Sequence, residues 1–409
     1  MKCRHCAHEL TLPFLDLGSA PPSNAYLTAA TLNAPEAWYP LRVLACTHCW
    51  LVQTEDHAGR EALFTDDYAY FSSFSSSWLA HAKSYVGDMV GRFGLTAQSH
   101  VVEVAANDGY LLQYVMEAGV PCLGVEPTAS TAAAAREKGI AIDERFFGVA
   151  LGRELAAAGK SADLTTANNV LAHVPDINDF VGGFTALLKP EGVATFEFPH
   201  LMQMVEFCQF DTAYHEHYSY LSLTAVRRIF EANGLAVFDV QALPTHGGSL
   251  RVLAQRADTG RHAVTPAVQQ VLGAEADAGM LTPEFYSRFD LQPKRIVREL
   301  LSFLVATAEE GGRVAAYGAA AKGNTLCNFA GVRPHLLPYV VDKNPAKQGK
   351  FMPGSRIPIV DEAHLRAHRP SHVLILPWNL KDEVTAQLGY IREWGGRFVT
   401  AVPRLEILP

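Results

Sequence analysis

The stretch VVEVAANDGYLL, residues 101–112, decides the fold class of this chain. Its first part is a short run of apolar, β-branched residues, which is typical of a buried strand. A tight turn at Asn107, Asp108 and Gly109 follows, and then a helical pattern begins. A strand that passes through a glycine turn into a helix is the opening unit of a βαβ fold, and the glycine lets the backbone approach a ligand closely.

Outward from this stretch, strand-like and helical patterns alternate along the chain. Further strands are expected at residues 122–127, 163–170, 192–199, 236–244 and 249–256. After a long helical pattern over about 262–312, a second series of strands is expected at 313–319, 337–344, 371–379 and 397–403. Such alternation indicates parallel sheets that are covered on both faces.

We therefore predict an α/β protein with a small N-terminal zinc-binding module and two Rossmann-like, doubly wound lobes. The expected domains are 1–65, 66–260 and 261–409. A net charge of −8, from 34 basic and 42 acidic residues, argues against nucleic acid as the main partner. No apolar run approaches the length of a membrane span, and the N-terminus lacks the pattern of a signal peptide, so we expect a cytoplasmic protein without a membrane partner.

Two Cys-x-x-Cys pairs stand in the first 49 residues, and paired spacing of this kind is typical of a structural zinc site. The alternative is two unconnected pairs of buried thiols. His5, His8 and His48 are close enough in the sequence to replace a sulfur ligand, but we expect four thiolates. The predicted ligands are Cys3, Cys6, Cys46 and Cys49.

Polar residues stand at the ends of the first three expected strands. Glu126 ends the second strand, where Rossmann-like folds hold an acidic residue for ribose hydroxyls. Taken singly, the glycine turn could be an ordinary βα turn. Polar residues at the ends of successive strands, in this order, favour a ribose-bearing cofactor. They do not by themselves distinguish SAM from a dinucleotide. The candidate cofactor-binding residues are Glu103, Asn107, Asp108, Gly109, Glu126 and Asn169.

Residues 214–220, YHEHYSY, hold two imidazoles, one carboxylate and three phenols. This density has three explanations: a metal site that uses His215 and His217, a satisfied structural cluster, or acid/base chemistry. We favour the third, because histidine titrates near neutral pH and a neighbouring carboxylate can orient it.

Together these motifs resemble the SAM-dependent C-methyltransferases of deoxysugar biosynthesis, which act on nucleotide-linked 4-keto sugars. The resemblance covers essentially the whole chain and implies a zinc-binding N-terminal domain, a SAM-binding domain and a C-terminal Rossmann-like domain. The SAM motif of that family reads Glu-x-Gly-x-Asn-Asp-Gly. Here Ala105 stands in the first glycine position, which we interpret as a tolerated variant.

The resemblance also implies site residues. The Tyr-x-Glu-His pattern of the family maps onto Tyr214, Glu216 and His217, where it serves proton abstraction next to the keto group. We assign His217 as the base and Glu216 as its orienting partner, which accepts a hydrogen bond from the distal nitrogen, or as the alternate base. Tyr214 is a candidate donor on the enolate side, and His173 could donate to the same oxygen.

Three further segments are expected to meet the substrate. The glycine turn at residues 246–251 could approach a sugar or phosphate, although a simple hairpin turn is its alternative. Residues near Tyr68 resemble the aromatic segment of the family, and the helix N-terminus with Lys322 in residues 317–324 could take a diphosphate. The candidate substrate-binding residues are Tyr68, His246, Ser249, Arg251, Tyr317, Lys322 and Asn324.

The function predicted from the sequence is SAM-dependent C-methylation of a nucleotide-linked 4-keto deoxysugar, with C3 preferred over C5 as the acceptor carbon. The cofactors are SAM and structural zinc. A NAD(P)-dependent sugar oxidoreductase is the main rival, although neither lobe carries G-x-G-x-x-G. A zinc-anchored binding module without catalysis is the third possibility, which the dense 214–220 cluster disfavours.

Overall fold

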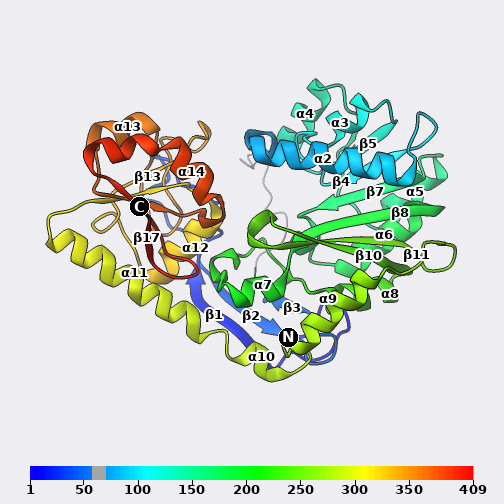
Figure 1. Cartoon of the computed structure of the whole chain (residues 1–409), viewed down its shortest axis with the longest axis horizontal. Helices are drawn as coiled ribbons and strands as arrows, with labels where there is room; N and C mark the ends of the chain where they lie inside the picture. The colour runs from blue at the N-terminus through cyan, green and yellow to red at the C-terminus, as the bar shows by residue number, and fades with distance from the viewer. Residues whose placement is uncertain (58–70, 409) are drawn as a thin grey trace.

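The computed structural model describes residues 1–57 and 71–408, which build two α/β lobes joined by a smaller N-terminal sheet (Figure 1). The central lobe contains a seven-stranded sheet in the order β10-β11-β8-β7-β4-β5-β6. Its strands are β4 (Val101–Val104), β5 (Cys122–Val125), β6 (Ile142–Asp143), β7 (Ala162–Asn168), β8 (Leu188–Pro199), β10 (Leu235–Leu243) and β11 (Ser249–Arg256). The strands from β4 to β8 pair in parallel, and β11 is antiparallel to both of its neighbours.

Helices cover both faces of this sheet, as the alternating pattern predicts. One face packs against α2 (Ser76–Phe93), α3 (Leu112–Glu117) and α4 (Ala129–Glu137). The other face packs against α5 (Val149–Ala157), α6 (Ile177–Leu187), α8 (Leu223–Ala232) and α9 (Pro266–Asp277). The α/β fold class is confirmed.

The C-terminal lobe has a six-stranded sheet in the order β14-β13-β12-β15-β16-β17, parallel except for β17. Its strands are β12 (Val314–Tyr317), β13 (Val340–Val341), β14 (Ile359–Val360), β15 (His372–Ile375), β16 (Arg397–Thr400) and β17 (Glu406–Leu408). Its helices are α11 (Leu291–Glu309), α12 (Ala321–Ala330), α13 (Glu362–His368) and α14 (Lys381–Gln387).

The helical pattern over about 262–312 contains three helices, α9, α10 (Pro283–Ser287) and α11. The first break begins after Asp277 and contains Gly279, which adopts a left-handed φ of 86°, and Pro283 then starts the next helix. The first of these helices belongs with the central lobe, because buried Glu275 on α9 accepts hydrogen bonds from the backbone nitrogens of Leu223 (2.6 Å) and Thr224 (2.8 Å).

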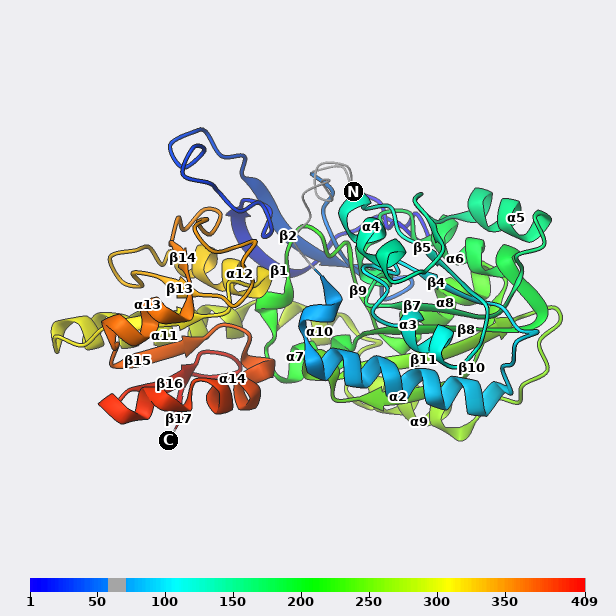
Figure 2. The same cartoon turned by 90° about the horizontal axis from the view of Figure 1, so that it is seen from above.

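The N-terminal sheet lies between the two lobes (Figure 2). It contains β1 (Leu12–Ala20), β2 (Tyr39–Ala45) and β3 (Val52–Thr54), and its fourth strand, β9 (Ser219–Tyr220), comes from the central segment of the chain. Apolar residues of β1 and β2 share one core with α12 and β13 of the C-terminal lobe. The N-terminal module is therefore a structural bridge between the two lobes. Among the described residues, we find no helix with the length and apolarity needed to cross a bilayer.

Candidate active site

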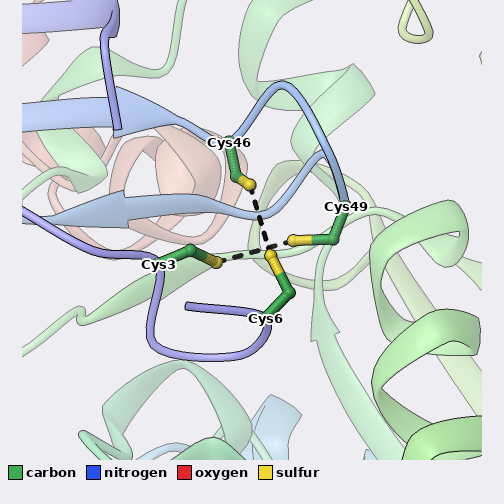
Figure 3. Close-up of side chains that lie close together, drawn as sticks. All are labelled: Cys3, Cys6, Cys46 and Cys49. Atoms are coloured by element: carbon green, nitrogen blue, oxygen red, sulfur yellow. Dashed lines mark hydrogen bonds between the residues drawn. The ribbon is translucent and has the colours of Figure 1, made fainter. Parts of the chain in front are cut away.

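The four predicted zinc ligands meet in one cluster, with their sulfur atoms pointing toward one another (Figure 3). All four Sγ atoms lie within 4.8 Å of one another; the Cys3–Cys49 separation is 3.5 Å and the Cys6–Cys46 separation is 3.6 Å. Tetrahedral zinc with Zn–S bonds of about 2.3 Å sets its sulfurs about 3.8 Å apart. The cluster therefore fits a zinc ion.

Each cysteine pair stands on a turn of the same construction. The carbonyl of Cys3 accepts a hydrogen bond from Ala7 N, and the carbonyl of Cys46 accepts one from Trp50 N, both at 2.9 Å. Ala7 and Trp50 both have left-handed backbone angles. In addition, Gln53 Nε2 donates to Cys3 Sγ at 3.2 Å, which helps to stabilise a thiolate.

A cavity of about 200 Å³ opens at the carboxyl ends of β4, β5 and β7, the edge where parallel sheets bind ligands. Three residues that line it, Ala105, Asn107 and Asn169, have φ between 50° and 58°. Ala105 thus takes the left-handed conformation that glycine adopts without strain, which explains why the related motif has glycine there. Other polar or aromatic residues of the lining include Trp78, Glu126, Thr128, Arg145, Phe146, His173 and His246.

Glu126 connects the tips of two strands. Its Oε2 accepts a hydrogen bond from Asn107 N and its Oε1 accepts one from Thr128 N, both at 2.9 Å. Burial raises the pKa of the Glu126 carboxyl. The side chain thus lines the cavity while it fixes the turn after β4, which is the place predicted for a ribose-binding carboxylate.

The other predicted cofactor residues lie behind or beside this cavity. Glu103 is buried within β4, and burial raises the pKa of its carboxyl well above the ordinary value. Gly109 has no room for a side chain, because a Cβ would come 2.3 Å from Ile140. Asp108 Oδ2 accepts a hydrogen bond from Ser73 N at 3.2 Å, which holds the short 3-10 helix (Ser72–Phe74) that precedes α2 against the turn. Their places indicate that Asp108 and Gly109 shape the turn, while Glu103 lies in the strand before it.

Two imidazoles meet at one end of the cavity. His173 lines the cavity, and its ring lies edge-on to His217 with 4.6 Å between ring centroids. His173 Nδ1 donates to the Glu216 carbonyl and His217 Nδ1 donates to the Thr212 carbonyl, both at 2.8 Å. A neutral imidazole that donates through Nδ1 presents Nε2 as an acceptor, so both rings are arranged to take a proton.

The environment keeps these two rings uncharged. Burial lowers the pKa of His173 to about 4. Burial, together with the neighbouring His173 and Lys322, lowers the pKa of His217 well below its ordinary value. The ring of Tyr214 packs on His217 with 3.9 Å between centroids. The base predicted from the sequence is therefore neutral at pH 7.

The structure corrects two expectations about this cluster. The partner that orients His217 is the Thr212 carbonyl, so the expected hydrogen bond from His217 to the Glu216 carboxylate is wrong. Glu216 Oε1 instead accepts from Asn24 Nδ2 of the N-terminal module at 3.2 Å, and burial raises the pKa of Glu216. The expected donation from His173 to the enolate oxygen is also wrong, because its Nδ1 proton is directed to the Glu216 carbonyl.

The C-terminal lobe contributes a cation to the same place. Lys322 Nζ, at the start of α12, donates to Asn379 Oδ1 at 2.7 Å and lies 4.6 Å from the centroid of the Trp378 ring. Trp378 Nε1 donates to Asp211 Oδ2 at 2.8 Å, and Asp211 directly precedes the residue whose carbonyl orients His217. Burial raises the pKa of Asp211 to about 6.

His246 forms a further wall of the cavity. Its backbone is left-handed, with φ of 54°, and its ring lies edge-on to Trp78 with 5.2 Å between centroids. Burial lowers the pKa of this imidazole to about 4. The next residue, Gly247, lies directly against the Trp378 ring, because an added Cβ would come within 2.6 Å of it. The loop is thereby clamped between the two lobes.

Other predicted substrate residues lie away from the cavity. Arg251 is buried and pairs with Glu197 at 3.2 Å, and Ser249 Oγ donates to the Thr245 carbonyl at 2.9 Å. Tyr317 lies in a core on the sheet face that packs against α13 and α14, and Asn324 Nδ2 donates to the Ser23 carbonyl at 2.7 Å. These four side chains are engaged within the protein. Tyr68 lies outside the described residues.

Several residues that build the site were not singled out from the sequence. Trp78 and His81 stand one helical turn apart on α2, and their rings stack with 4.9 Å between centroids. His81 Nε2 lies 2.9 Å from Glu197 Oε2, deep in the lobe. Their spacing of three residues places both rings on one face of the helix and could have indicated this pair from the sequence. For Thr212, which acts through its carbonyl, no side-chain signal existed.

Comparison with known proteins agrees with this arrangement. Family models match residues 3–64 as a zinc binding domain, 78–240 as a methyltransferase domain and 244–403 as a C-methyltransferase C-terminal domain. The chain is 34% identical to the C-methyltransferase NovU of Streptomyces niveus over 410 residues, which covers 100% of this chain and 96% of that protein.

Solved structures also match part of the chain. A Burkholderia thailandensis 1,6-didemethyltoxoflavin-N1-methyltransferase is 17% identical, with a TM-score of 0.38, and the match covers 51% of this chain and 96% of that one. The magnesium protoporphyrin IX methyltransferase of Synechocystis with bound SAM is 16% identical, with a TM-score of 0.34, and covers 44% and 79%. These two likenesses carry no further argument.

The fold and the family models define a SAM-dependent methyltransferase with a structural zinc module. Because one relative is 34% identical over the whole length, the chain belongs to the C-methyltransferase family that this relative represents. The oxidoreductase and the binding module without catalysis are thereby set aside. The lining at the strand tips fits SAM.

Proposed function

We propose that this enzyme methylates a carbon beside the ketone of a nucleotide-linked 4-keto deoxysugar, with C3 as the acceptor carbon. The observation that carries the proposal is the imidazole pair: His173 lines the cofactor cavity, and His217, whose Nδ1 donates to the Thr212 carbonyl and leaves Nε2 as the acceptor, lies against the His173 ring. A carbon acid needs such a base, whereas an oxygen or nitrogen nucleophile needs much less help. The substrate class follows from the related family.

In this reaction, one group of residues removes the proton and another binds the cofactor. His217 Nε2 removes the proton from the carbon beside the ketone, since a ketone makes that hydrogen acidic enough for an imidazole. SAM supplies an electrophilic methyl group on a sulfonium. Glu126, Asn107 and Asn169 hold the cofactor at the strand tips, so that methyl transfer needs mainly in-line positioning.

His217 is preferred to Glu216 on geometry. Burial lowers the pKa of His217 and raises that of Glu216, so basicity alone does not favour the imidazole. However, the Glu216 carboxylate is turned toward the N-terminal module, where it binds Asn24, while the imidazole faces His173 at the cavity. We therefore keep His217 as the base and assign Glu216 to positioning: its carbonyl holds His173 and its carboxylate binds Asn24.

We further propose that the C-terminal lobe binds the nucleotide part of the substrate, that the domains are 1–65, 66–260 and 261–409, with α9 of the last range packed on the central lobe, and that the reaction is cytoplasmic. Incubation of the enzyme with SAM and a nucleotide-linked 4-keto-6-deoxysugar tests the function. The expected product is a C3-methylated sugar, identified by NMR, with one equivalent of S-adenosylhomocysteine. Methylation at C5, or on oxygen or nitrogen, would contradict the proposed position.

A further inference from the structure

Removal of a proton beside a ketone creates an enolate, and its oxygen needs a donor or a positive charge nearby. The two imidazoles at the cavity cannot serve, because both present acceptor nitrogens and both are uncharged. Glu216 is a carboxyl group that binds Asn24. The phenol of Tyr214, the donor expected from the sequence, carries no positive charge, so a positive charge for the enolate must come from another group of the site.

Lys322 is a cation that the C-terminal lobe brings to this place, whereas Arg145, which lines the cavity, is paired with Asp143 and Glu154. Helix α12 packs on the 210–212 turn, and Thr325 Oγ1 of that helix donates to the Ala213 carbonyl at 2.9 Å. The same turn holds His217 through the Thr212 carbonyl, so the base and the helix that carries the amine are both fixed to this turn. In addition to burial, the positive charge of Lys322 lowers the pKa of both His217 and His246.

The amine is arranged to remain a cation that can still donate. Its hydrogen-bond acceptor is the neutral amide oxygen of Asn379, which uses one of three N–H donors, and the Trp378 ring covers another side. Burial lowers the pKa of Lys322, and the negative charge of Asp211 opposes that shift. Asp211 is itself held by Trp378 Nε1, so it supports the charge of the amine without a direct hydrogen bond being needed.

We propose that Lys322 of the C-terminal lobe is a catalytic residue that stabilises the enolate oxygen while His217 removes the proton. This inference rests on the proposed function and replaces the expected contact between Lys322 and a diphosphate. The C3–H electron pair becomes the C3–C4 double bond, the proton goes to His217 Nε2, and the carbonyl electron pair moves onto the oxygen beside the ammonium. The enolate carbon then attacks the methyl group, whose bond to sulfur breaks with both electrons going to sulfur, and the ketone re-forms.

Lys322→Met removes the charge at nearly constant length, and hydrogen exchange separates the two possible roles. The variant and the wild type are saturated with the 4-keto nucleotide-sugar in heavy water without SAM, and deuterium at C3 is followed by NMR. Substrate and SAM dissociation constants are measured by calorimetry. We expect exchange to fall about 10²–10³-fold, as for loss of one oxyanion donor. We expect the substrate dissociation constant to change less than about threefold, because the amine acts on developing charge.

Lys294→Met, on the outer helix α11, is the matched control and should exchange like the wild type. Lys322→Gln keeps a hydrogen-bond donor without the charge, so its rate of C3 exchange should lie between those of the wild type and Lys322→Met. An unchanged SAM affinity shows that each variant is folded. Normal exchange at saturation with a substrate affinity weakened tenfold or more would make Lys322 a phosphate ligand and overturn the proposal. Normal values of both would overturn it as well. A wild type that neither exchanges C3 nor forms a methylated sugar would instead overturn the proposed function.

Discussion

In the central lobe the turn after β4 faces a cavity. In the C-terminal lobe the corresponding turn after β12 is covered by other side chains of the protein, which donate hydrogen bonds to it. Both turns are held by an acid at the tip of the next strand: Glu126 accepts from Asn107 N at 2.9 Å, and Asp342 accepts from Ala319 N at 2.8 Å. The local construction of the two lobes is thus the same.

The surroundings of the two turns differ. The carbonyl of Ala319 accepts hydrogen bonds from the Tyr26 hydroxyl at 2.6 Å and from Lys347 Nζ at 2.9 Å, so the N-terminal module closes over the second turn. The helix that follows carries Lys322 to the site of the first lobe. One topology therefore serves cofactor binding in one lobe and delivery of a side chain in the other, which is why function must be argued from the site and not from the fold.

Loss of zinc should have the largest effect, because it removes the module that joins the two lobes. We expect Cys46→Ser/Cys49→Ser to lose the metal and, with it, the N-terminal sheet that bridges the lobes, since apparent zinc binding energies of about 10–16 kcal/mol are folding energy. Activity should fall about 100-fold or more. Elemental analysis and turnover measure this, with Cys122→Ser, outside the cluster, as the control. A metal-free variant of normal activity would contradict the structural role.

Acid should destabilise the site of the central lobe. The pKa of His173 and of His246 is about 4 in the folded protein, below the ordinary 6.5, so the unfolded chain binds protons first as pH falls. Each group therefore contributes stability that is complete above pH 6.5 and is lost between pH 6.5 and 4, about 3 kcal/mol over the whole interval. Unfolding free energies at pH 7 and pH 5 should show a smaller loss for His246→Gln than for the wild type. The exposed His335→Gln should keep the full loss, and equal losses in all three would contradict the assignment.

The two acids at the strand tips form a matched pair. Glu126→Ala should weaken SAM binding by about 1–3 kcal/mol, because polar groups are left unpaired at the cavity. Asp342→Ala should leave the SAM dissociation constant within about twofold, since it acts in the other lobe, and lower the melting temperature instead. Calorimetric titration of both variants with SAM measures the difference. Equal SAM affinities in the two variants would contradict the claim that only the acid of the central lobe acts in SAM binding.

The smallest expected effect concerns the contact that closes the second turn. Tyr26→Phe removes the hydroxyl that donates to the Ala319 carbonyl, and we expect a loss of about 0.5–1.5 kcal/mol in unfolding free energy. SAM affinity should be unchanged. Denaturant titration checks the stability, and a variant that binds SAM more weakly would show that the module acts on the first lobe as well.

The zinc cluster and the strand-tip cavity could be predicted from the sequence because their signals are local. Paired Cys-x-x-Cys spacing defines two turns, and one metal is enough to bring them together. Glu126 could be found because parallel strands place their carboxyl ends on one edge of the sheet, so that order along the chain gives position in space.

The junction of the lobes could not be predicted, because it depends on contacts between distant segments. Asn24 reaches Glu216, and Trp378 reaches Asp211, only through the packing of whole lobes. The hairpin residue Arg251 has the chemistry of a phosphate ligand, but it is buried against Glu197, a partner that only the register of β11 and β8 reveals. His217 could be singled out as a candidate base from its side chain, whereas the Thr212 carbonyl that orients it is a backbone group and gives no side-chain signal.

The assignment of the base to His217 is tested most directly by proton loss and methyl transfer measured in the same tube. His217→Asn and Glu216→Gln are incubated with SAM and the 4-keto nucleotide-sugar in heavy water, and deuterium at C3 is followed together with methylated product. We predict that His217→Asn loses both signals and that Glu216→Gln retains reduced amounts of each. Normal exchange in His217→Asn, with exchange lost in Glu216→Gln, would contradict the account and make the carboxylate the base.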